Sequence, residues 1–254
     1  MKILVIGDSC IDKFIYCDIN RICPEAPVPV LQPIHETENP GMAANVVANL
    51  ESLGATVDVI TNDYAEFMVK TRYIDDKSGQ MIMRLDEKDE CTGIDFHPEW
   101  QNCINKDFDL EYDAIVVSDY DKGLLTIWDI AHIGKTAKCP TFLDTKKKLG
   151  DWCKDIDFIK INKPEWQLNP DYNETNVIVT DGKNGAWYKD ETFSVDKEVK
   201  VSDVSGAGDT FLAGLVYKYV YGINVMKQHD ISLAINFANK CASKVVQERG
   251  VTVV

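Results

Sequence analysis

Val201-Ser-Asp-Val-Ser-Gly-Ala-Gly-Asp-Thr-Phe211 leads directly into a long predicted helix. Two glycines in it allow a tight backbone turn, and the first N–H groups of the helix have no partner within it. Because the helix dipole adds positive charge there, Gly206, Ala207 and Gly208 are predicted to form an anion hole. Asp209 follows, where it can accept a proton from a hydroxyl that attacks phosphorus. A bare G-x-G-D is more often a plain turn with a first-turn acid, but the strand-like segment before it and the helix after it favour the catalytic interpretation.

Short apolar runs elsewhere predict buried parallel strands, and several of them alternate with helical patterns. Such alternation is typical of βαβ units. We therefore expect an α/β fold of three layers, with a mainly parallel central sheet and helices on both faces. The predicted strands cover residues 3–6, 57–60, 114–117, 141–143, 158–161 and 177–179. The predicted helices cover 43–53, 125–136, 207–221 and 231–247, with a shorter one near Trp152.

Two segments depart from the α/β rhythm. Residues 14–19 and 28–34 flank a Pro-rich link, and residues 72–74 and 81–85 flank a polar turn. Both pairs resemble hairpin strands, so we expect a small β lid within about residues 13–34 and 71–86. No linker divides the chain, and we expect a single domain over residues 1–254.

The numbers of charged residues and cysteines limit the classes of function that we expect. The sequence has 27 Lys and Arg residues and 41 Asp and Glu residues, which gives a formal net charge of −14. An acidic surface of this kind repels nucleic acid and anionic membranes. An anionic substrate therefore requires a locally positive pocket. The eight cysteines include no C-x-x-C pair, which favours reduced thiols. The apolar run among the first residues is too short for a signal peptide, and we expect a cytoplasmic protein.

Two acids follow the first predicted strand. Asp8 and Asp12 lie four residues apart where α/β proteins bind ligands, and carboxylates accept hydrogen bonds from sugar hydroxyls. Taken alone, a turn acid and a solvated acid explain the pair equally well.

Two further motifs stand at predicted helix starts. Gly41 permits close approach, and Asn45 offers a donor and an acceptor, although small residues before a helix often serve packing alone. Asn162 and Glu165 can hold a hydrated Mg²⁺ or orient a phosphate. Without the glycine turn at 206–208, an Asx cap with Pro in the first turn would be the preferred explanation of that second motif.

Polar residues follow other predicted strands. Thr180 and Gly182 can present a hydroxyl and the backbone to nucleotide phosphates, unless the stretch is a plain hairpin turn. Asp119, Lys122 and Lys146 come after two more strands and complete a polar rim. The sequence contains no P-loop, nucleophile elbow or H-E-x-x-H pattern.

These motifs together resemble the ribokinase-like, or phosphofructokinase-B, family of carbohydrate kinases. Residues 203–210 resemble its D-T-x-G-A-G-D signature, residues 40–45 its G-G-x-x-x-N signature, and residues 162–165 its N-x-x-E motif. Residues 21–30, Arg-Ile-Cys-Pro-Glu-Ala-Pro-Val-Pro-Val, are very similar to the lid segment of the heptose 7-phosphate kinases within that family. The likeness covers the whole chain in order.

The resemblance implies a ribokinase-like fold that uses ATP and Mg²⁺ to phosphorylate the anomeric hydroxyl of D-glycero-D-manno-heptose 7-phosphate, giving the 1,7-bisphosphate. By matched position, Asp209 would be the base, with Gly206 to Gly208 stabilising the transferring phosphoryl group. The remaining matches imply Asp12, Gly41 and Asn45 at the sugar, Asn162 and Glu165 at Mg²⁺ and phosphate, and Thr180, Gly182 and Asn239 near the nucleotide. Charge reasoning adds Arg21, Lys122 and Lys146 as partners of the substrate phosphate.

The chain also departs from the family pattern. Met42 replaces the second glycine of the first signature, and the chain is short between residues 60 and 72 and between 165 and 177. These shortenings avoid every motif but remove core, so we expect a homodimer through the lid strands. Two alternatives stay open: another sugar or nucleoside kinase of the same fold, and a catalytically silent binding homologue. A Rossmann dehydrogenase is excluded, because no G-x-G-x-x-G follows the first strand.

Overall fold

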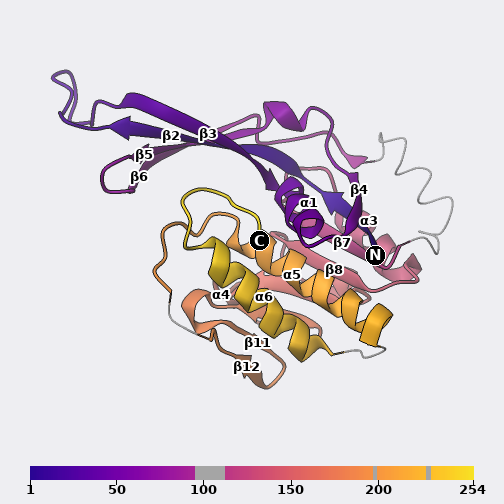
Figure 1. Ribbon diagram of the computed structural model, residues 1–254. Helices are drawn as coiled ribbons and strands as arrows, with labels where there is room; N and C mark the ends of the chain where they lie inside the picture. The colour runs from indigo at the N-terminus through magenta and orange to yellow at the C-terminus, as the bar shows by residue number, and fades with distance from the viewer. Residues whose placement is uncertain (95–111, 197–198, 227–229) are drawn as a thin grey trace.

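The fold consists of a central β-sheet between helical layers and a smaller sheet that projects from one edge (Figure 1). The computed structural model describes residues 1–94, 112–196, 199–226 and 230–254. Within these residues the central sheet has eight strands in the order β12-β11-β10-β9-β8-β7-β1-β4. Their bounds are β1 Lys2–Gly7, β4 Thr56–Ile60, β7 Ala114–Asp119, β8 Thr141–Thr145, β9 Phe158–Asn162, β10 Val177–Thr180, β11 Ala186–Tyr188 and β12 Glu191–Phe193.

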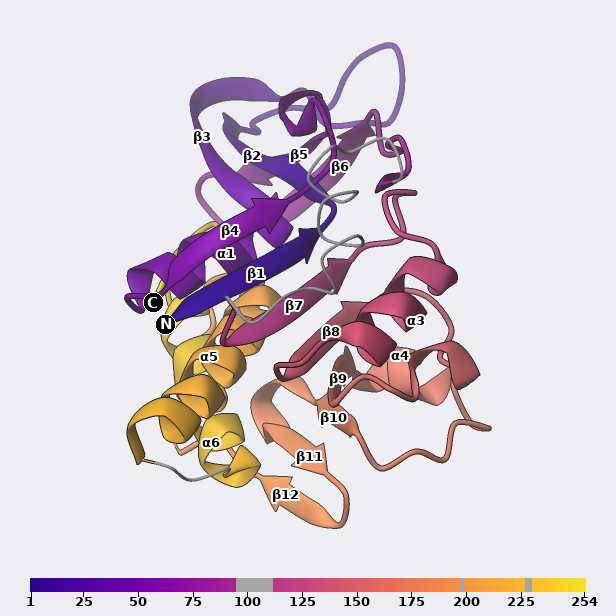
Figure 2. The same cartoon turned by 90° about the vertical axis from the view of Figure 1, so that its right-hand side faces the viewer.

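Helices cover both faces of this sheet, as the turned view in Figure 2 shows. One face carries α1 (Ala43–Ser52), α5 (Ala207–Tyr221) and α6 (Ile231–Val245), and the other carries α3 (Ile127–Thr136) and α4 (Lys163–Gln167). The expected three-layer, mainly parallel α/β fold is confirmed. Shorter turns are η1 Ala65–Phe67, η3 Asp151–Cys153, η4 Gly182–Asn184 and the π-helical η5 Gly222–Met226.

Alternation along the strands explains the two core layers. In β1, Ile3 and Val5 pack with α1, α5 and α6, whereas Leu4 and Ile6 pack with the α3 side. A fully buried aliphatic side chain stabilises the fold by about 1.5–3 kcal/mol relative to an exposed one. Helix α5 is apolar around most of its circumference, and this composition is typical of a helix enclosed by the core.

The lid is a four-stranded sheet in the order β3-β2-β5-β6, with bounds β2 Ser9–Asp18, β3 Gln32–Met42, β5 Val69–Asp75 and β6 Met81–Glu87. A separate β lid was predicted, and it is present. Strands β2 and β3 are longer than the sequence pattern indicates. β2 starts at Ser9, two residues after the end of β1, and β3 continues to Met42, the residue directly before α1. Ser9 at the start of β2 and Met42 at the end of β3 are antiparallel partners, and this pair lies where the lid joins β1 and α1. The lid is therefore anchored directly in β1 and α1.

Other differences from the predicted elements are local. The segment near residue 152 forms only the single turn η3. Strand β10 pairs with β11 in antiparallel fashion, so residues 181–185 form the hairpin turn that was the simpler interpretation of the Thr180–Gly182 motif. Among the described residues, no helix combines the length and the apolar character needed to span a membrane.

Candidate active site

The glycine turn before α5 has the geometry of an open helix N-terminus. Gly206 has φ 75°, in the left-handed region that favours glycine, and no side chain caps the helix. A Cβ at Gly206 would also lie 2.6 Å from Asn45 Nδ2, so no larger residue fits. The Ala207 N–H donates to the Val204 carbonyl at 3.3 Å. The other N–H groups of the first turn have no partner within the helix, and together with the dipole of α5 they make this turn suitable for an anion.

Asp209 is buried in the first turn of α5 and accepts two hydrogen bonds. The Tyr120 hydroxyl donates to Oδ1 at 2.6 Å, and Asn45 Nδ2 donates to Oδ2 at 3.0 Å. Burial raises the pKa of Asp209 to about 6, while the two donors and the nearby Lys160 act in the opposite direction. A carboxylate with that pKa is ionised at neutral pH and basic enough to accept a proton.

A polar chain between α1 and α5 fixes the Asn45 amide. Asn49 Nδ2 donates to Asn45 Oδ1 at 3.0 Å, and Thr210 Oγ1 donates to Asn49 Oδ1 at 3.2 Å. Because Asn45 Oδ1 accepts a hydrogen bond, its Nδ2 is the atom directed at Asp209. Asn45 and Asp209, 164 residues apart in the sequence, are thus held together in the interior.

Asp12 reaches the same place from β2. The guanidinium of Arg72 pairs with Asp12 Oδ1 and lies over the Phe14 ring at 5.1 Å. A Cβ at Gly41 would come within 2.4 Å of Asp12 Oδ2, so this glycine leaves room for the carboxylate. The predicted group of Asp12, Gly41, Asn45 and Asp209 is therefore assembled at the base of the lid.

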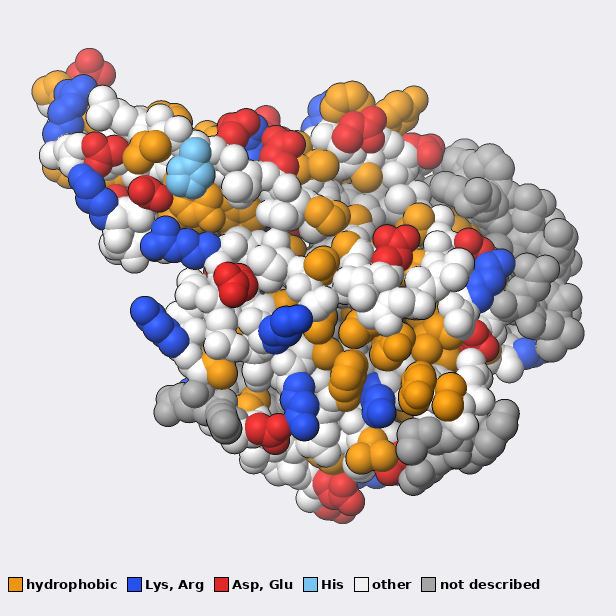
Figure 3. Space-filling view, in the orientation of Figure 1, with side chains coloured by type: hydrophobic (Ala, Val, Ile, Leu, Met, Phe, Trp, Pro, Cys, Tyr) orange, Lys and Arg blue, Asp and Glu red, His pale blue; other side chains and the backbone are white. Residues whose placement is uncertain are grey.

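A basic pocket of about 300 Å³ lies between the lid and the central sheet. Figure 3 shows the hollow beneath the projecting lid and basic side chains beside it. The lining includes Asp12, Met42, Tyr120, Gly206 and Asp209 together with five cations, Lys70, Arg72, Arg84, Lys122 and Lys146. Each cation has a carboxylate partner, and these partners are Asp12, Asp86, Asp89 and Glu165. An anionic ligand in this pocket would therefore compete with these acids for the cations.

Sequence reasoning identified two of these cations and missed three. Lys122 and Lys146 line the pocket, whereas Arg21 is exposed in the loop between β2 and β3. That loop forms the far end of the lid in Figure 1. The structure therefore does not bring Arg21 to this pocket. The sequence analysis assigned no role to Lys70, Arg72 or Arg84. The K-x-R alternation in β5, paired across to Arg84 in β6, could have indicated a basic face.

Asp8 and Asp119 lie behind the pocket. Asp8 accepts hydrogen bonds from the backbone N–H of Tyr120 at 2.7 Å and of Lys122 at 3.4 Å, and burial raises its pKa. Asp119 accepts from Lys147 Nζ at 2.7 Å and Thr145 Oγ1 at 2.5 Å. These two acids hold the loop that carries Tyr120 and Lys122, rather than lining the pocket themselves.

Asn162 and Glu165 form a reciprocal cap at the start of α4. Asn162 Oδ1 accepts from the Glu165 N–H at 2.9 Å, and Glu165 Oε2 accepts from the Asn162 N–H at 2.8 Å. The other carboxylate oxygen, Oε1, pairs with Lys146, whose ammonium also lies 5.3 Å from the centre of the Tyr120 ring. The motif is thus linked to Asp209 through Lys146 and Tyr120.

The donor set does not form a direct metal cage. In the described ranges, no group of three His, Cys, Asp or Glu side chains lies close enough to hold a metal ion. The Asn162 amide oxygen and both Glu165 carboxylate oxygens already have protein partners. These residues therefore suit a hydrated Mg²⁺ that is held mainly by nucleotide phosphates, which is the usual mode for this ion.

A second pocket, of about 260 Å³, opens on the other side of the glycine turn. Ala207 and Gly208 line it, together with Thr180, Gly182 and Asn239, which were the residues predicted near a nucleotide. Asn239 Nδ2 is occupied by the Phe193 carbonyl at 2.8 Å. The remaining lining is largely apolar, namely Val195, Val199, Val201, Val204, Phe211, Ala242 and Val246, with Lys183, Gly185 and Ser243 beside it.

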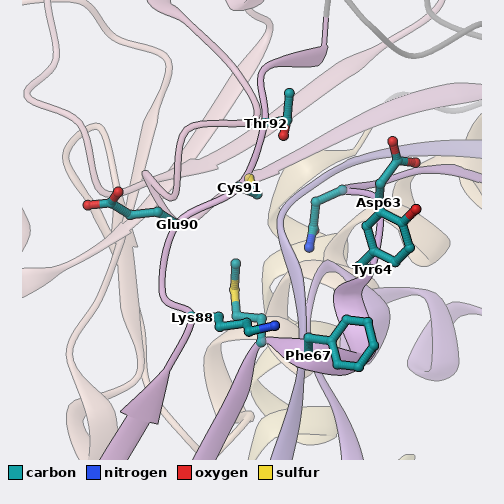
Figure 4. A pocket seen from close by; sticks show the side chains of 9 residues that line it. Asp63, Tyr64, Phe67, Lys88, Glu90, Cys91 and Thr92 are labelled. Atoms are coloured by element: carbon teal, nitrogen blue, oxygen red, sulfur yellow. The ribbon is translucent and has the colours of Figure 1, made fainter.

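A third pocket, of about 420 Å³, lies between η1 and the segment after β6 (Figure 4). Lys88 lies over the ring of Phe67 at 4.6 Å, and Tyr64 is the other exposed aromatic residue there. Met68 and Cys91 form its floor and pack, on their other side, against Met42 and Tyr120 of the basic pocket. No motif in the sequence indicated this cavity.

Comparison with known proteins identifies the family. The model of the pfkB family of carbohydrate kinases matches residues 110–254, more than half of the chain. The chain belongs to this family. Carbohydrate kinases are phosphotransferases, and the glycine turn and Asp209 both lie within the matched residues.

Curated relatives extend the likeness to nearly the whole chain. Bifunctional protein HldE of Campylobacter jejuni subsp. jejuni serotype O:6 is 31% identical over 292 positions, and HldE of Nitratiruptor sp. is 31% identical over 298. Each match covers 98% of this chain but only 62% of the relative. Both alignments are longer than the chain's 254 residues, so the relatives contain segments that this pfkB member lacks.

Solved structures share the fold. The ribokinase of Thermotoga maritima superposes with a TM-score of 0.67 at 17% identity, covering 98% of this chain and 94% of its own. Phosphofructokinase-2 of Escherichia coli in complex with potassium gives 0.71 at 14% identity, covering 99% and 94%. The ribokinase-like architecture of this pfkB chain is thereby confirmed.

Proposed function

We propose that the chain is an ATP-dependent sugar-phosphate kinase whose acceptor is the anomeric hydroxyl of D-glycero-D-manno-heptose 7-phosphate, with the 1,7-bisphosphate as product. One observation carries the proposal. Gly206 and Asp209 line the basic pocket, while Ala207 and Gly208 between them line the apolar one. The base and the anion hole thus lie between the basic pocket, which suits an anionic polyol, and the apolar pocket, which suits a nucleotide. Phosphoryl transfer requires this arrangement.

In this mechanism the sugar hydroxyl lies against Asp209. Its oxygen forms a bond to the γ-phosphorus of ATP, the bridging P–O bond breaks, and ADP leaves with that electron pair. The hydroxyl proton passes to the Asp209 carboxylate, and the turn at Gly206 to Gly208 stabilises the charge on the transferring group. Tyr120 and Asn45 keep the carboxylate oriented throughout.

The basic pocket supports a substrate that carries its own phosphate. Five cations line a volume of about 300 Å³, and their acidic partners leave room for a phosphate dianion to compete for them. Asp12 is placed to accept sugar hydroxyls, with Gly41 providing the space that its carboxylate occupies. The choice of a heptose rests on the resemblance of residues 21–30 to the heptose kinases.

The apolar pocket supports ATP as the donor, with Thr180, Gly182 and Asn239 beside it. Glu165, together with the Asn162 cap, would hold the hydration shell of a Mg²⁺ ion bound to the nucleotide. When bound, Mg²⁺ neutralises phosphate charge. Asp209 is the protein group that accepts the proton in this mechanism.

An ADP-release assay tests the proposal. We expect turnover with heptose 7-phosphate and much slower turnover with the free heptose, fructose 6-phosphate, ribose and nucleosides. Asp209→Asn should lower kcat about 10²–10⁴-fold while the chain stays folded. A variant within tenfold of the wild type would remove Asp209 from the role of base.

Two outcomes would favour the alternatives. Preference for another sugar would point to a different kinase of the same fold. Ligand binding without ADP release, measured by calorimetry, would point to a silent homologue. Met42, at a position where the family signature has glycine, and the two shortened segments favour the silent homologue, whereas the intact Asp209, Asn162 and Glu165 oppose it.

We also propose a homodimer that pairs through the lid strands. Its support is the exposed apolar side of β6, where Met81, Met83 and Leu85 are 44–53% exposed. Contiguous exposed apolar residues on an edge strand are a known site of association.

A further inference from the structure

Lys160 is a buried cation beneath the glycine turn. It lies in the middle of β9, on the strand face toward α5, and is 5% exposed. Its ammonium is 2.6 Å from Asp144 Oδ2, on the neighbouring strand β8. Lys160 also lowers the pKa of Asp209, which places its charge close to the base.

This ion pair leaves hydrogen-bonding capacity unused on both partners. A lysine ammonium has three N–H donors, and among the described residues Asp144 is its only hydrogen-bond acceptor. In the same part of the chain, Asp144 Oδ1 is buried and has no hydrogen-bond partner. Buried donors of a charged group are costly to leave unpaired, so two free N–H groups on Lys160 require an explanation.

Gly208 shows where Lys160 is directed. A Cβ at Gly208 would lie 3.0 Å from Lys160 Nζ, which is the one described atom within 4 Å of that point outside the neighbouring residues and backbone of α5 itself. Gly208 lies inside α5 and lacks the positive φ of Gly206, so its backbone conformation does not demand glycine. The missing side chain is what lets the ammonium approach the turn, whose N–H groups face the expected phosphoryl group.

We propose that Lys160 is a further catalytic residue, whose ammonium donates hydrogen bonds to the phosphoryl group during transfer. The inference rests on the proposed kinase function and adds one group to it. Lys160 takes no part in the proton transfer, because the hydroxyl proton goes to Asp209 while the sugar O–P bond forms and the bond to ADP breaks. Asp144 holds the ammonium in place and keeps the buried charge balanced when no nucleotide is bound.

A purely structural ion pair is the competing explanation. A buried pair is weak evidence for stability, because apolar residues of similar volume often replace such a pair without loss. A structural pair would also use its donors and acceptors internally, whereas among the residues that the structure describes this one leaves Asp144 Oδ1 and two Lys160 donors without a partner.

Nucleotide binding and turnover together test the proposal. The variants are Asp144→Asn and the double variant Asp144→Asn/Lys160→Met, which leaves no buried charge without its partner and is therefore expected to fold. Relative to Asp144→Asn, the double variant should bind a non-hydrolysable ATP analogue at least tenfold more weakly, with ADP affinity changed less than threefold. Its kcat should fall about 10²–10³-fold, as when one preorganised donor to a developing charge is removed.

Contrary results are equally defined. Equal weakening of both nucleotides, or a kcat for the folded double variant within threefold of Asp144→Asn, would overturn the role of Lys160. The matched control is Asp58→Asn/Lys2→Met, which removes a Lys–Asp pair of 3.0 Å between β1 and β4, away from both pockets. It should leave nucleotide binding and turnover unchanged.

The nucleotide-binding measurements distinguish a failure of the Lys160 inference from a failure of the proposed kinase function. If no sugar is a substrate but the wild type prefers the triphosphate and the double variant does not, the kinase assignment fails and the Lys160 contact stands. If turnover is normal and that preference survives in the double variant, the kinase assignment stands and the Lys160 contact fails. A wild type that binds neither nucleotide would overturn both.

Discussion

The Tyr120 hydroxyl lies 2.6 Å from Asp209 Oδ1, and the ring of the same tyrosine lies under the ammonium of Lys146. Tyr120 thus connects the carboxylate on α5 to the Lys146–Glu165 pair at the start of α4. A cation over an aromatic ring is attracted to its face, so Lys146 helps to hold the ring against Asp209. One tyrosine side chain therefore joins the Gly206–Asp209 turn to the Asn162–Glu165 cap.

Replacing Tyr120 with Phe should move the pH dependence of turnover. The hydrogen bond from Tyr120 lowers the pKa of Asp209, which burial otherwise raises to about 6. Its loss should raise that pKa further. Because the base must be deprotonated, the acidic limb of kcat against pH should shift to higher pH.

The matched control is Tyr112→Phe, which removes a hydroxyl–carboxylate hydrogen bond of 2.8 Å to Asp58 at the edge of the sheet. That variant should keep the wild-type pH profile. An unchanged acidic limb in Tyr120→Phe would mean that the tyrosine only supports packing.

Asp209 should also make folding stability depend on pH. Burial raises its pKa in the folded chain from 3.8 to about 6, so the folded state favours the protonated acid. Its stabilising contribution is complete below about pH 3.8 and is lost as the pH rises through about 6. Asp209→Asn does not titrate, so its stability relative to the wild type should increase from pH 4 to pH 6 and then level off.

Urea unfolding at a series of pH values measures this difference. A difference that stays constant from pH 4 to pH 7 would contradict the raised pKa of Asp209.

Local sequence determines part of this site, and tertiary pairing determines the rest. The Gly206–Asp209 turn could be predicted because its glycines, its acid and the following helix are contiguous. Lys160 could not, because its importance depends on Asp144 from another strand and on the space left by Gly208. Arg21 was chosen on charge alone, and charge does not say where a loop points.

The same distinction applies to the fold. The parallel strands were predictable because both faces are buried, and their sequences are continuous apolar runs. The lid strands were predicted too short. Asp12 and Gly41 look like loop residues in the sequence, but pairing between β2 and β3 holds them in extended strands.

Met42 should carry backbone strain that glycine relieves. It has φ 58° and ψ −130°, a conformation in which a residue with a Cβ is strained by about 1–3 kcal/mol. Its side chain is buried among Cys10, Met68 and Tyr120. Met42→Gly and Met42→Ala both remove that packing, but only glycine adopts this backbone freely.

Met42→Gly should therefore be more stable than Met42→Ala, by about 1 kcal/mol or more in urea unfolding. This order is the reverse of that expected at an unstrained site, where glycine is the less stable of the two because of its greater chain entropy. An alanine variant that is equal or superior would refute the strain at this position.

Lys122 should determine the preference for a phosphorylated sugar. It lines the basic pocket and is paired with Asp89, which a substrate phosphate can replace. Charge-assisted hydrogen bonds contribute about 1.5–3 kcal/mol, so Lys122→Met should raise KM for the sugar phosphate about 10- to 100-fold. KM for the free sugar should change little.

Lys77→Met is the control, since Lys77 pairs with Asp18 on the exposed part of the lid. It should leave both KM values as they are. Equal increases for phosphorylated and free sugar in Lys122→Met would show that Lys122 does not bind the phosphate.

Charge on the outer side of β6 should dissociate the proposed lid dimer. Met83 is 48% exposed, on the opposite strand face to Arg84, which lines the basic pocket. Met83→Glu therefore places a charge in the apolar contact without entering the substrate site. Sedimentation equilibrium should show a dimer for the wild type and a monomer for this variant, whereas Met83→Leu should remain dimeric. A wild type that sediments as a monomer at micromolar concentration would overturn the lid interface, and an unchanged dimer in Met83→Glu would locate the contact elsewhere on the molecule.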